Sequence, residues 1–140
     1  MLCEDIMKSE VTCITPQDTV QSAARRMREE NIGFLPVCDS SGRILGTITD
    51  RDMALRVLSD GRPASTTVGD VMTREVIACR PDDELIRAEE LMAQNHKSRI
   101  MVTEGNRLVG VISLSDIAKA EDGPRASQTL RRVSEREIHA

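Results

Sequence analysis

The chain has 140 residues, of which 39% are hydrophobic and 30% are charged, and its formal net charge is −4 at pH 7. The acidic balance and the single aromatic residue, Phe34, argue against nucleic-acid binding, which uses basic surfaces and aromatic stacking. No apolar run approaches the roughly 20 residues that cross a bilayer. The first seven residues contain two acids and no apolar stretch, so no signal peptide is expected. These features predict a globular cytoplasmic protein with no membrane or nucleic-acid partner.

The four cysteines and two histidines form no metal-ligand pattern in the sequence. No two cysteines are spaced as C-x-x-C, and neither His96 nor His139 lies near a cysteine along the chain. A zinc site needs clustered ligands. We therefore expect no metal, and reduced thiols rather than a disulfide framework.

The chain contains an internal repeat. Asp5-Ile6-Met7 reappears as Asp70-Val71-Met72. The same offset then pairs Glu10 with Glu75, Val11 with Val76, Pro16 with Pro81, Asp18 with Asp83, Ala23 with Ala88, Met27 with Met92, and Val37 with Val102. After the loss of one residue in a turn, the match resumes with Arg43 and Arg107, Gly46 and Gly110, Ile48 and Ile112, Asp52 and Asp116, and Ala54 and Ala118. So many identities in one order predict two copies of one structural unit.

Each copy begins with a short strand and a proline-containing turn, followed by a helix. The strands are predicted at Val11–Ile14 and Val76–Cys79. Asp18 and Asp83 are expected to be the helix N-caps. Apolar residues then recur on one helical face: Val20, Ala23, Ala24 and Met27 in the first copy, and Leu85, Ala88, Leu91 and Met92 in the second.

Each copy ends with a β-hairpin and a second helix. The hairpin strands are predicted at Phe34–Cys38 with Ile44–Thr49, and at Arg99–Thr103 with Leu108–Ser113. The closing helices are predicted at Arg51–Ser59 and Ser115–Glu121. The order β-α-β-β-α therefore occurs twice.

The predicted fold class is α+β, built from two α/β-type βαββα repeats. A unit of roughly 60 residues buries little core alone. We therefore expect the repeats to pack through their sheets as a pseudo-twofold pair. Repeat 1 is expected to cover 1–62, a linker 63–68, and repeat 2 69–122. The charged tail, 123–140, is expected to be flexible or to pack on a partner.

Three motifs carry a family resemblance: Asp5-Ile6-Met7, the stretch Ile32-Gly33-Phe34-Leu35-Pro36-Val37, and Gly46-Thr47-Ile48-Thr49-Asp50-Arg51-Asp52. With their counterparts in the second copy, they make residues 5–120 similar to the CBS (cystathionine-β-synthase) domain family. The resemblance implies paired repeats whose clefts bind adenosine-containing ligands: AMP, ADP or ATP, with S-adenosylmethionine as a further ligand of the family. It also implies a regulatory or signalling role, and a homodimer formed from two such pairs.

The residue chemistry agrees with this resemblance. Thr49 and Asp52 form a T-x-x-D, and Ser113 and Asp116 form an S-x-x-D, each where a strand becomes a helix. There the carboxylate could accept hydrogen bonds from ribose hydroxyls, while free helix N–H groups face a phosphate. The alternative is a capping box, in which the two side chains only satisfy helix N–H groups.

The resemblance pairs the aspartate of one repeat with the first hairpin strand of the other, which gives two candidate nucleotide sites. The first site joins Thr49, Arg51, Asp52, Lys97, Ser98, Arg99 and Met101. The second site joins Ile32, Gly33, Phe34, Pro36, Ser113, Ser115 and Asp116. Arg99 suits phosphate oxygens, whereas the second site has nothing basic nearby in sequence. The second site is therefore expected to be weaker or empty.

Two readings of the function remain open. No catalytic set, P-loop or G-x-G-x-x-G is present, so the chain is not expected to be an enzyme. In the first reading it senses adenine nucleotides and modulates a separate effector protein, which the sequence does not name. In the second it is a dimeric scaffold or stress-response protein with degenerate clefts. Apolar helix residues (Ala23, Met27, Leu91 and Met92) favour a homodimer if exposed, but fit equally well in a core within the chain.

Overall fold

In the computed structural model of the chain, residues 1–120 and 124–139 are described, and they form two compact units. Unit 1 contains Met1–Val11 and Ile77–Ala140, and unit 2 contains Thr12–Val76. These units divide the chain differently from the predicted repeats, because the first eleven residues pack with the second half. The predicted boundary between repeat 2 and the tail, at residues 122 and 123, lies outside the described residues.

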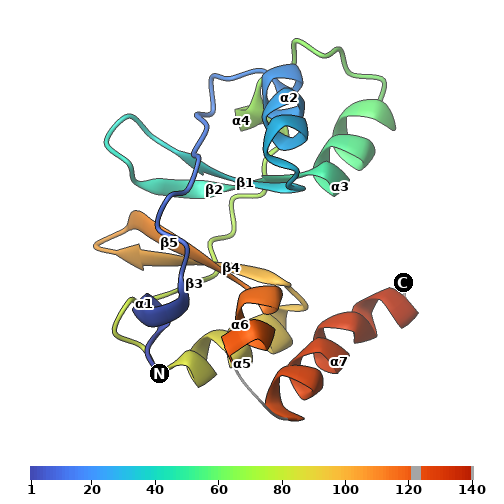
Figure 1. Ribbon diagram of the computed structural model, residues 1–140. Helices are drawn as coiled ribbons and strands as arrows, with labels where there is room; N and C mark the ends of the chain where they lie inside the picture. The colour runs from blue at the N-terminus through green and yellow to red at the C-terminus, as the bar shows by residue number, and fades with distance from the viewer. Residues whose placement is uncertain (121–123, 140) are drawn as a thin grey trace. The chain divides into compact units, whose positions relative to one another are not determined.

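Unit 2 is a two-stranded antiparallel hairpin with helices on one face (Figure 1). Leu35, Val37 and Ile48 point to the helical face, because side chains alternate along a strand. They pack there with Ala23 and Met27 of the first long helix. The elements are α2 (Val20–Glu30), β1 (Phe34–Cys38), β2 (Ile44–Thr49), α3 (Asp50–Met53), a π-helical turn η1 (Ala54–Leu58) and α4 (Val68–Val71).

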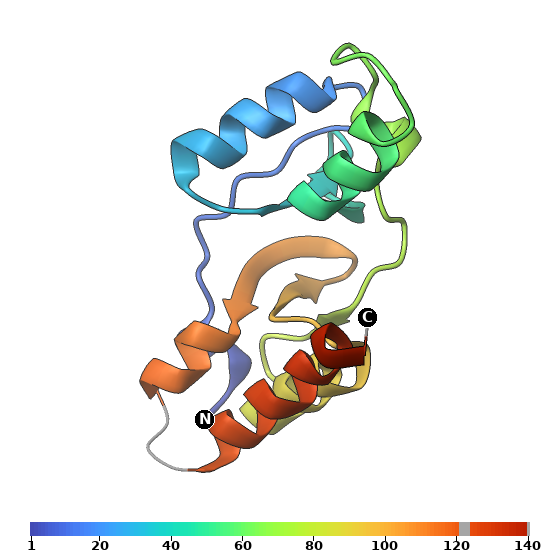
Figure 2. The same cartoon turned by 90° about the vertical axis from the view of Figure 1, so that its right-hand side faces the viewer.

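Unit 1 has the same plan with one more strand and one more long helix. Its helices cover one face of a three-stranded sheet of order β3-β4-β5, as both views show (Figure 2). Ile100, Val102 and Ile112 face those helices and pack with Ala88 and Met92. The elements are α1 (Cys3–Ile6), β3 (Ala78–Cys79), α5 (Leu85–Asn95), β4 (Arg99–Glu104), β5 (Arg107–Ser113), α6 (Leu114–Ala120) and α7 (Pro124–His139).

The first residues of each repeat, here called its leading segment, pack with the rest of the other repeat. Residues 1–11 are the leading segment of repeat 1, and the residues around Val68 and Thr73 are that of repeat 2. In unit 1, Cys3 N donates to Asp83 O (2.9 Å), and Lys8 and Val111 exchange two backbone hydrogen bonds. In unit 2, Val68 N donates to Asp18 O (2.8 Å), and Thr73 and Thr47 exchange two such bonds. The predicted linker is part of this docking, since Val20 N donates to Thr66 O (2.8 Å).

Two local predictions are corrected by the structure. The first strand of repeat 1 is reduced to one parallel bridge between Ile14 and Val37. Asp18 and Asp83 are not the N-caps, because those positions are held by Thr19 and Glu84. Instead, Asp18 Oδ2 accepts from Thr15 N, and Asp83 Oδ2 accepts from Arg80 N, both at 2.8 Å. These carboxylates therefore close the turn that precedes each helix.

The expected flexible tail is instead the helix α7, which packs on α5 and α6. Arg125 Nε lies 2.8 Å from Glu89 Oε2, a carboxylate that is only 3% exposed. Val133 packs against the unit 1 core, and Thr129 is buried. The sequence did not predict this packing, because most residues of α7 are polar or charged and few are apolar.

The residues that favoured a dimer lie inside the units. Ala23 and Met27 belong to the core of unit 2, and Met92 belongs to the core of unit 1. Leu91 is half-buried against the unit 1 core. Of the two readings for these residues, the core within the chain is the one the structure supports.

Candidate functional site

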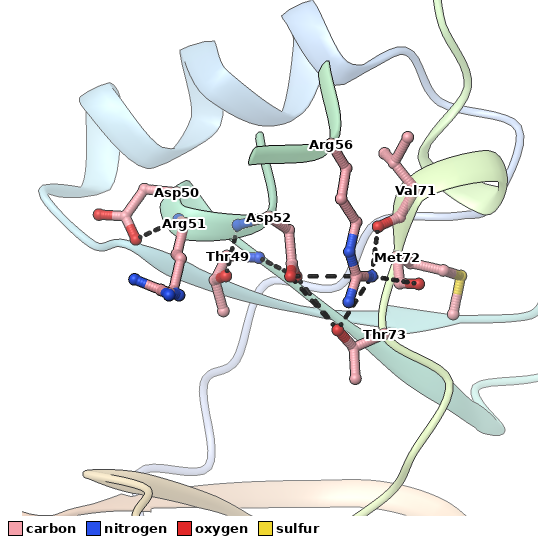
Figure 3. Close-up of polar contacts among 8 residues, drawn as sticks. All are labelled: Thr49, Asp50, Arg51, Asp52, Arg56, Val71, Met72 and Thr73. Carbon is pink, nitrogen blue, oxygen red and sulfur yellow. Dashed lines mark hydrogen bonds and ion pairs between the residues drawn. The ribbon is translucent and has the colours of Figure 1, made fainter. Parts of the chain in front are cut away.

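The strand-to-helix junction of unit 2 is a reciprocal capping box (Figure 3). Asp52 N donates to Thr49 Oγ1, and Thr49 N donates to Asp52 Oδ2, both at 3.0 Å. The short side chains of a T-x-x-D reach each other's backbone because three residues make almost one helical turn. The capping alternative raised by the sequence is therefore present in the structure.

The Asp52 carboxylate has two further neighbours, which come from other elements. Thr73 Oγ1 lies 3.3 Å from Asp52 Oδ1, and Arg56 Nη1 lies 3.8 Å from the same oxygen (Figure 3). Arg56 is itself anchored, because its Nη1 donates to the carbonyl oxygens of Val71 (2.9 Å) and Met72 (3.1 Å). Asp52 is thus held on several sides, and its side chain is 13% exposed.

The first backbone N–H groups of α3 are already bonded. Asp50 N donates to Gly33 O (3.0 Å), Arg51 N donates to Asp50 Oδ1 (2.9 Å), and Asp52 N donates to Thr49 Oγ1. The sequence-based expectation that free helix N–H groups face a phosphate is therefore wrong for this helix. These three N–H groups are not free to bind a phosphate in this structure.

The start of β1 lies beside the start of α3. Phe34 pairs with Thr49 in the hairpin, and a Cβ on Gly33 would come within 2.6 Å of Asp50 Oδ2. Glycine at position 33 therefore lets the Asp50 side chain lie against the strand. Phe34 and Pro36 alternate with the core residues Leu35 and Val37, so they point to the sheet face opposite the helices.

Unit 1 repeats the capping box. Ser113 N donates to Asp116 Oδ2 (3.0 Å), and Asp116 N donates to Ser113 Oγ (3.1 Å). Ser115 Oγ lies 2.9 Å from Ser113 Oγ. Lys8 Nζ lies 3.6 Å from Asp116 Oδ1, where the carboxylate is 11% exposed and the lysine 72% exposed.

The other predicted residues of unit 1 lie along the loop after α5 and the strand β4. Ser98 O accepts from Leu114 N (2.8 Å), and Arg99 pairs with Ser113 in the sheet. Lys97 is exposed and Arg99 is half-buried. Arg99 and Met101 alternate with the core residue Ile100, so they share the sheet face opposite the helices.

The structure thus groups the candidate residues by unit. In unit 2 it brings together Ile32, Gly33, Phe34 and Pro36 with Thr49, Arg51 and Asp52. In unit 1 it brings together Lys97, Ser98, Arg99 and Met101 with Ser113, Ser115 and Asp116. The two predicted nucleotide sites, each of which joins the aspartate of one unit to the first hairpin strand of the other, stay a prediction.

Sequence reasoning missed three residues that approach the aspartates, namely Arg56 in the same helical segment as Asp52, and Lys8 and Thr73. Lys8 and Thr73 occupy equivalent positions, just after the repeated Asp-Ile-Met and Asp-Val-Met. The repeat alignment could have paired them with each other, but not with Asp116 and Asp52. The second site has nothing basic nearby in sequence, and the structure adds Lys8, a residue distant in sequence that lies beside Asp116.

Neither a membrane span nor a metal-ligand cluster is found in the part of the chain that the structure describes. No helix there is long and apolar enough to cross a bilayer. The same residues contain no group of three or more histidine, cysteine or acidic side chains placed to hold a metal ion.

The duplicated hairpin and capped helix define the chain as a tandem-repeat α/β protein. More specifically, it belongs to the CBS domain family, whose family model matches residues 3–59 and 68–123. It is 36% identical over 137 residues to the CBS domain-containing protein YhcV of Bacillus subtilis (strain 168), covering 97% of both chains.

Solved structures agree with this assignment. The chain is similar to a crystal structure of Hypoxic Response Protein I with two coordinated zinc ions, with a TM-score of 0.81 and 31% identity, covering 87% of this chain and 100% of that one. It is also similar to the CBS domain pair of protein MJ0100 in complex with 5′-methylthioadenosine and S-adenosyl-L-methionine. That match has a TM-score of 0.77 and 26% identity, and covers 86% of this chain and 94% of the other.

Proposed function

We propose that the chain is a regulatory module that binds an adenosine-containing ligand and modulates a separate partner protein. The observation that carries the proposal is the capped aspartate, Asp52 or Asp116, at the same strand-to-helix junction in both units. The MJ0100 pair, which holds two adenosine derivatives, supports the ligand class. AMP, ADP, ATP and S-adenosylmethionine are the ligands to test.

The role assigned to each aspartate is to accept hydrogen bonds from ribose hydroxyls. A carboxylate offers about four acceptor positions. In unit 2, Thr49 N, the Thr73 hydroxyl and Arg56 Nη1 approach some of them, and we assign the remainder to a sugar. The Thr49 hydroxyl accepts from Asp52 N, and its own hydrogen is not used in that bond.

Phosphate binding is assigned to side chains, since the first N–H groups of α3 are bonded within unit 2. The sequence-based proposal places phosphate with Arg51, Lys97 and Arg99 in the site of Asp52. Lys8 adds an exposed cation beside Asp116. Because this cation can face a phosphate, we propose that both sites bind, although the sequence predicts the Asp116 site to be the weaker one.

Regulation would follow from differential affinity. A ligand shifts an equilibrium between two conformations only as far as it binds one more tightly than the other. We propose that the chain acts as a homodimer, and that the ligand changes how this homodimer binds the regulated partner protein. Leu55 and Leu58 on η1 are exposed apolar residues that such an assembly could cover. Light scattering with and without ligand measures the oligomeric state.

The test is calorimetric titration of nucleotide-free protein with each of the four ligands, using Asp52→Asn and Asp116→Asn variants. Asparagine keeps an acceptor for the capping bond and removes the charge. Each variant should lose at least about tenfold in affinity at its own site, as expected for a charge-assisted hydrogen bond. Asp39→Asn is the matched control, because Asp39 is an exposed carboxylate that bonds Ser41 and Arg43 within the hairpin turn.

Saturable binding that both site variants weaken, with the control unchanged, supports the proposal. No heat and no thermal shift with any ligand at high concentration would instead favour the scaffold reading.

A further inference from the structure

Two cysteines that are distant in the sequence meet in unit 2. Cys38 Sγ lies 2.8 Å from Cys13 Sγ, and Cys38 is the hydrogen-bond donor. The pair is held by the bridge beside it, in which Ile14 N donates to Pro36 O (3.0 Å) and Cys38 N donates to Ile14 O (2.8 Å). Cys13 is exposed, whereas Cys38 is buried.

We propose that Cys13 and Cys38 form a reversible disulfide when the protein meets a hydroperoxide. A disulfide bond is about 2.05 Å long, so the two sulfurs need to move by less than about 1 Å. In a reducing compartment such bonds are typically transient and redox-sensing rather than structural. The proposal is independent of the nucleotide function.

The reaction has two steps. The Cys13 thiolate attacks a peroxide oxygen, the O–O bond breaks, and Cys13 becomes a sulfenic acid while water is released. The Cys38 sulfur then attacks the Cys13 sulfur, the S–O bond breaks, and the thiol proton leaves with hydroxide as a second water. Overall, two thiols and one hydrogen peroxide give one disulfide and two waters. A dithiol reductant reverses the change.

The environment of the pair favours these roles. The hydrogen bond from Cys38 lowers the pKa of the Cys13 thiol, although partial burial opposes this. Donating that bond, together with burial, raises the pKa of Cys38. Cys13 is therefore the exposed thiolate that reacts first, and Cys38 is the neighbouring thiol that resolves the sulfenic acid.

The second cysteine pair differs in access. Cys3 Sγ and Cys79 Sγ lie 3.5 Å apart, but these residues are 0% and 3% exposed within the core of unit 1. Their equivalents in the other repeat are Val68 and Ile14, which are also core residues. Cys3 and Cys79 thus act as core side chains and serve as an internal control.

A metal is a less suitable occupant of the Cys13–Cys38 pair. Zinc is held in proteins by about four ligands, with at least three from side chains. Among residues 1–120 and 124–139, no group of three or more histidine, cysteine or acidic residues is placed to hold a metal. Two thiols alone fit oxidation better than metal binding.

The bond would fasten the chain close to where it passes from unit 1 to unit 2. That passage lies between Val11 and Thr12, and Cys13 follows immediately. The closed loop contains α2 and ends at β1. Closing it restricts the unfolded chain, so oxidation should raise Tm by roughly 5–10 °C.

The test is to treat the reduced full chain with hydrogen peroxide, block remaining thiols with iodoacetamide, and map the peptides after trypsin. Cleavage after Lys8, Arg25, Arg28 and Arg43 places the two cysteines on separate peptides, 9–25 and 29–43. The matched variants are Cys13→Ala and Cys38→Thr, which install the residues of the equivalent positions, Ala78 and Thr103. Cys3→Val, which installs the equivalent of Val68, removes the core pair instead.

We expect peptides 9–25 and 29–43 to be cross-linked in the wild type and in Cys3→Val, and the cross-link to disappear on reduction. It should be absent from Cys13→Ala and Cys38→Thr. The Tm increase should follow the same pattern. The proposal is overturned if iodoacetamide still alkylates both Cys13 and Cys38 after peroxide treatment. It is also overturned if Cys13 is found as a sulfenic acid or a higher oxide without a disulfide, or if the disulfide joins the Cys13 residues of two chains.

Discussion

Lys8 Nζ lies 3.6 Å from Asp116 Oδ1, and the equivalent of Lys8 in the other repeat, Thr73, places its hydroxyl 3.3 Å from Asp52 Oδ1. The leading segment of each repeat therefore supplies a partner to the aspartate of the other, in addition to the capping bonds within each junction. One aspartate has a cation as this partner, and the other has a neutral hydroxyl. The two sites therefore differ at the position held by Lys8 in one repeat and Thr73 in the other, which lies outside the T-x-x-D and S-x-x-D motifs.

The first prediction concerns that cation. Lys8→Thr makes unit 1 resemble unit 2, and we expect it to weaken phosphate-bearing ligands such as AMP by about threefold while leaving adenosine unchanged. Because Lys8 is largely exposed, the free energy of unfolding should change by less than about 1 kcal/mol. Titration with AMP and adenosine measures this difference. The control is Lys119→Thr, an exposed lysine of α6 in the same unit, and an equal loss in the control would contradict the assignment.

The second prediction separates capping from ligand binding. Thr49 caps α3 and Thr19 caps α2, each by accepting from a backbone N–H three residues later. Thr49→Ala and Thr19→Ala should therefore each lower the free energy of unfolding by about 1 kcal/mol. Only Thr49→Ala should also weaken nucleotide binding. Urea unfolding and calorimetry on both variants check this, and unchanged affinity in Thr49→Ala would leave that residue with a capping role alone.

The third prediction compares two equivalent glycines. A Cβ on Gly46 would collide with the carbonyl oxygen of Thr73, because the two backbones exchange hydrogen bonds there. A Cβ on Gly110 would meet Met7 Sδ at 2.7 Å and the Lys8 carbonyl oxygen at 3.1 Å. Since the Met7 side chain can move, Gly46→Ala should cost about 3 kcal/mol or more and Gly110→Ala about 1–2 kcal/mol. Urea midpoints decide the order, and a reversed order would contradict the close approach at Gly46.

The fourth prediction tests the docking of α7. Arg125 reaches the buried Glu89 carboxylate, so Arg125→Ala should destabilise the wild type more than it destabilises a Glu89→Ala variant. The equivalent of Glu89 in the other repeat is Ala24, which makes alanine a natural replacement. We expect a coupling free energy of about 1–2 kcal/mol from the double-mutant cycle. Additive effects would mean that this ion pair does not hold the helix.

The fifth prediction concerns thiol reactivity and its dependence on pH. The pKa of Cys13 is lowered by the hydrogen bond from Cys38, so Cys13 should hold more thiolate near neutral pH and react fastest with iodoacetamide. Cys38→Ala removes the donor, which raises the pKa of Cys13 and slows its reaction near neutral pH. Well above the ordinary cysteine pKa of about 8.5 the rate should not change.

Cys3 serves as the control for this prediction. The pKa of Cys3 is also lowered, by the hydrogen bond from Cys79, but Cys3 is fully buried. It should therefore stay unreactive in the native protein. Fast modification of Cys3, or a Cys13 rate profile that Cys38→Ala leaves unchanged, would contradict the proposed environment.

Much of each repeat could be predicted from short sequence patterns. The spacing of Val20, Ala23 and Met27 predicted the face of α2 that enters the core, and the hairpin at Phe34–Cys38 and Ile44–Thr49 has the predicted bounds. The capping boxes were also visible, because a T-x-x-D bonds within one turn. The N-caps were misplaced by one residue, since Asp18 and Asp83 compete for turn N–H groups just before each helix.

What the sequence determined by itself is therefore the duplication, the order of elements and the side chains at each strand-to-helix junction, because these depend on neighbours within a turn of helix or a hairpin. The tertiary structure alone decided that residues 1–11 pack with the second half, that Lys8 approaches Asp116, that Cys13 meets Cys38, and that α7 docks on α5. These contacts join segments far apart in the chain. They arise from which sheet edge and which apolar face each segment covers, and no local periodicity encodes that choice.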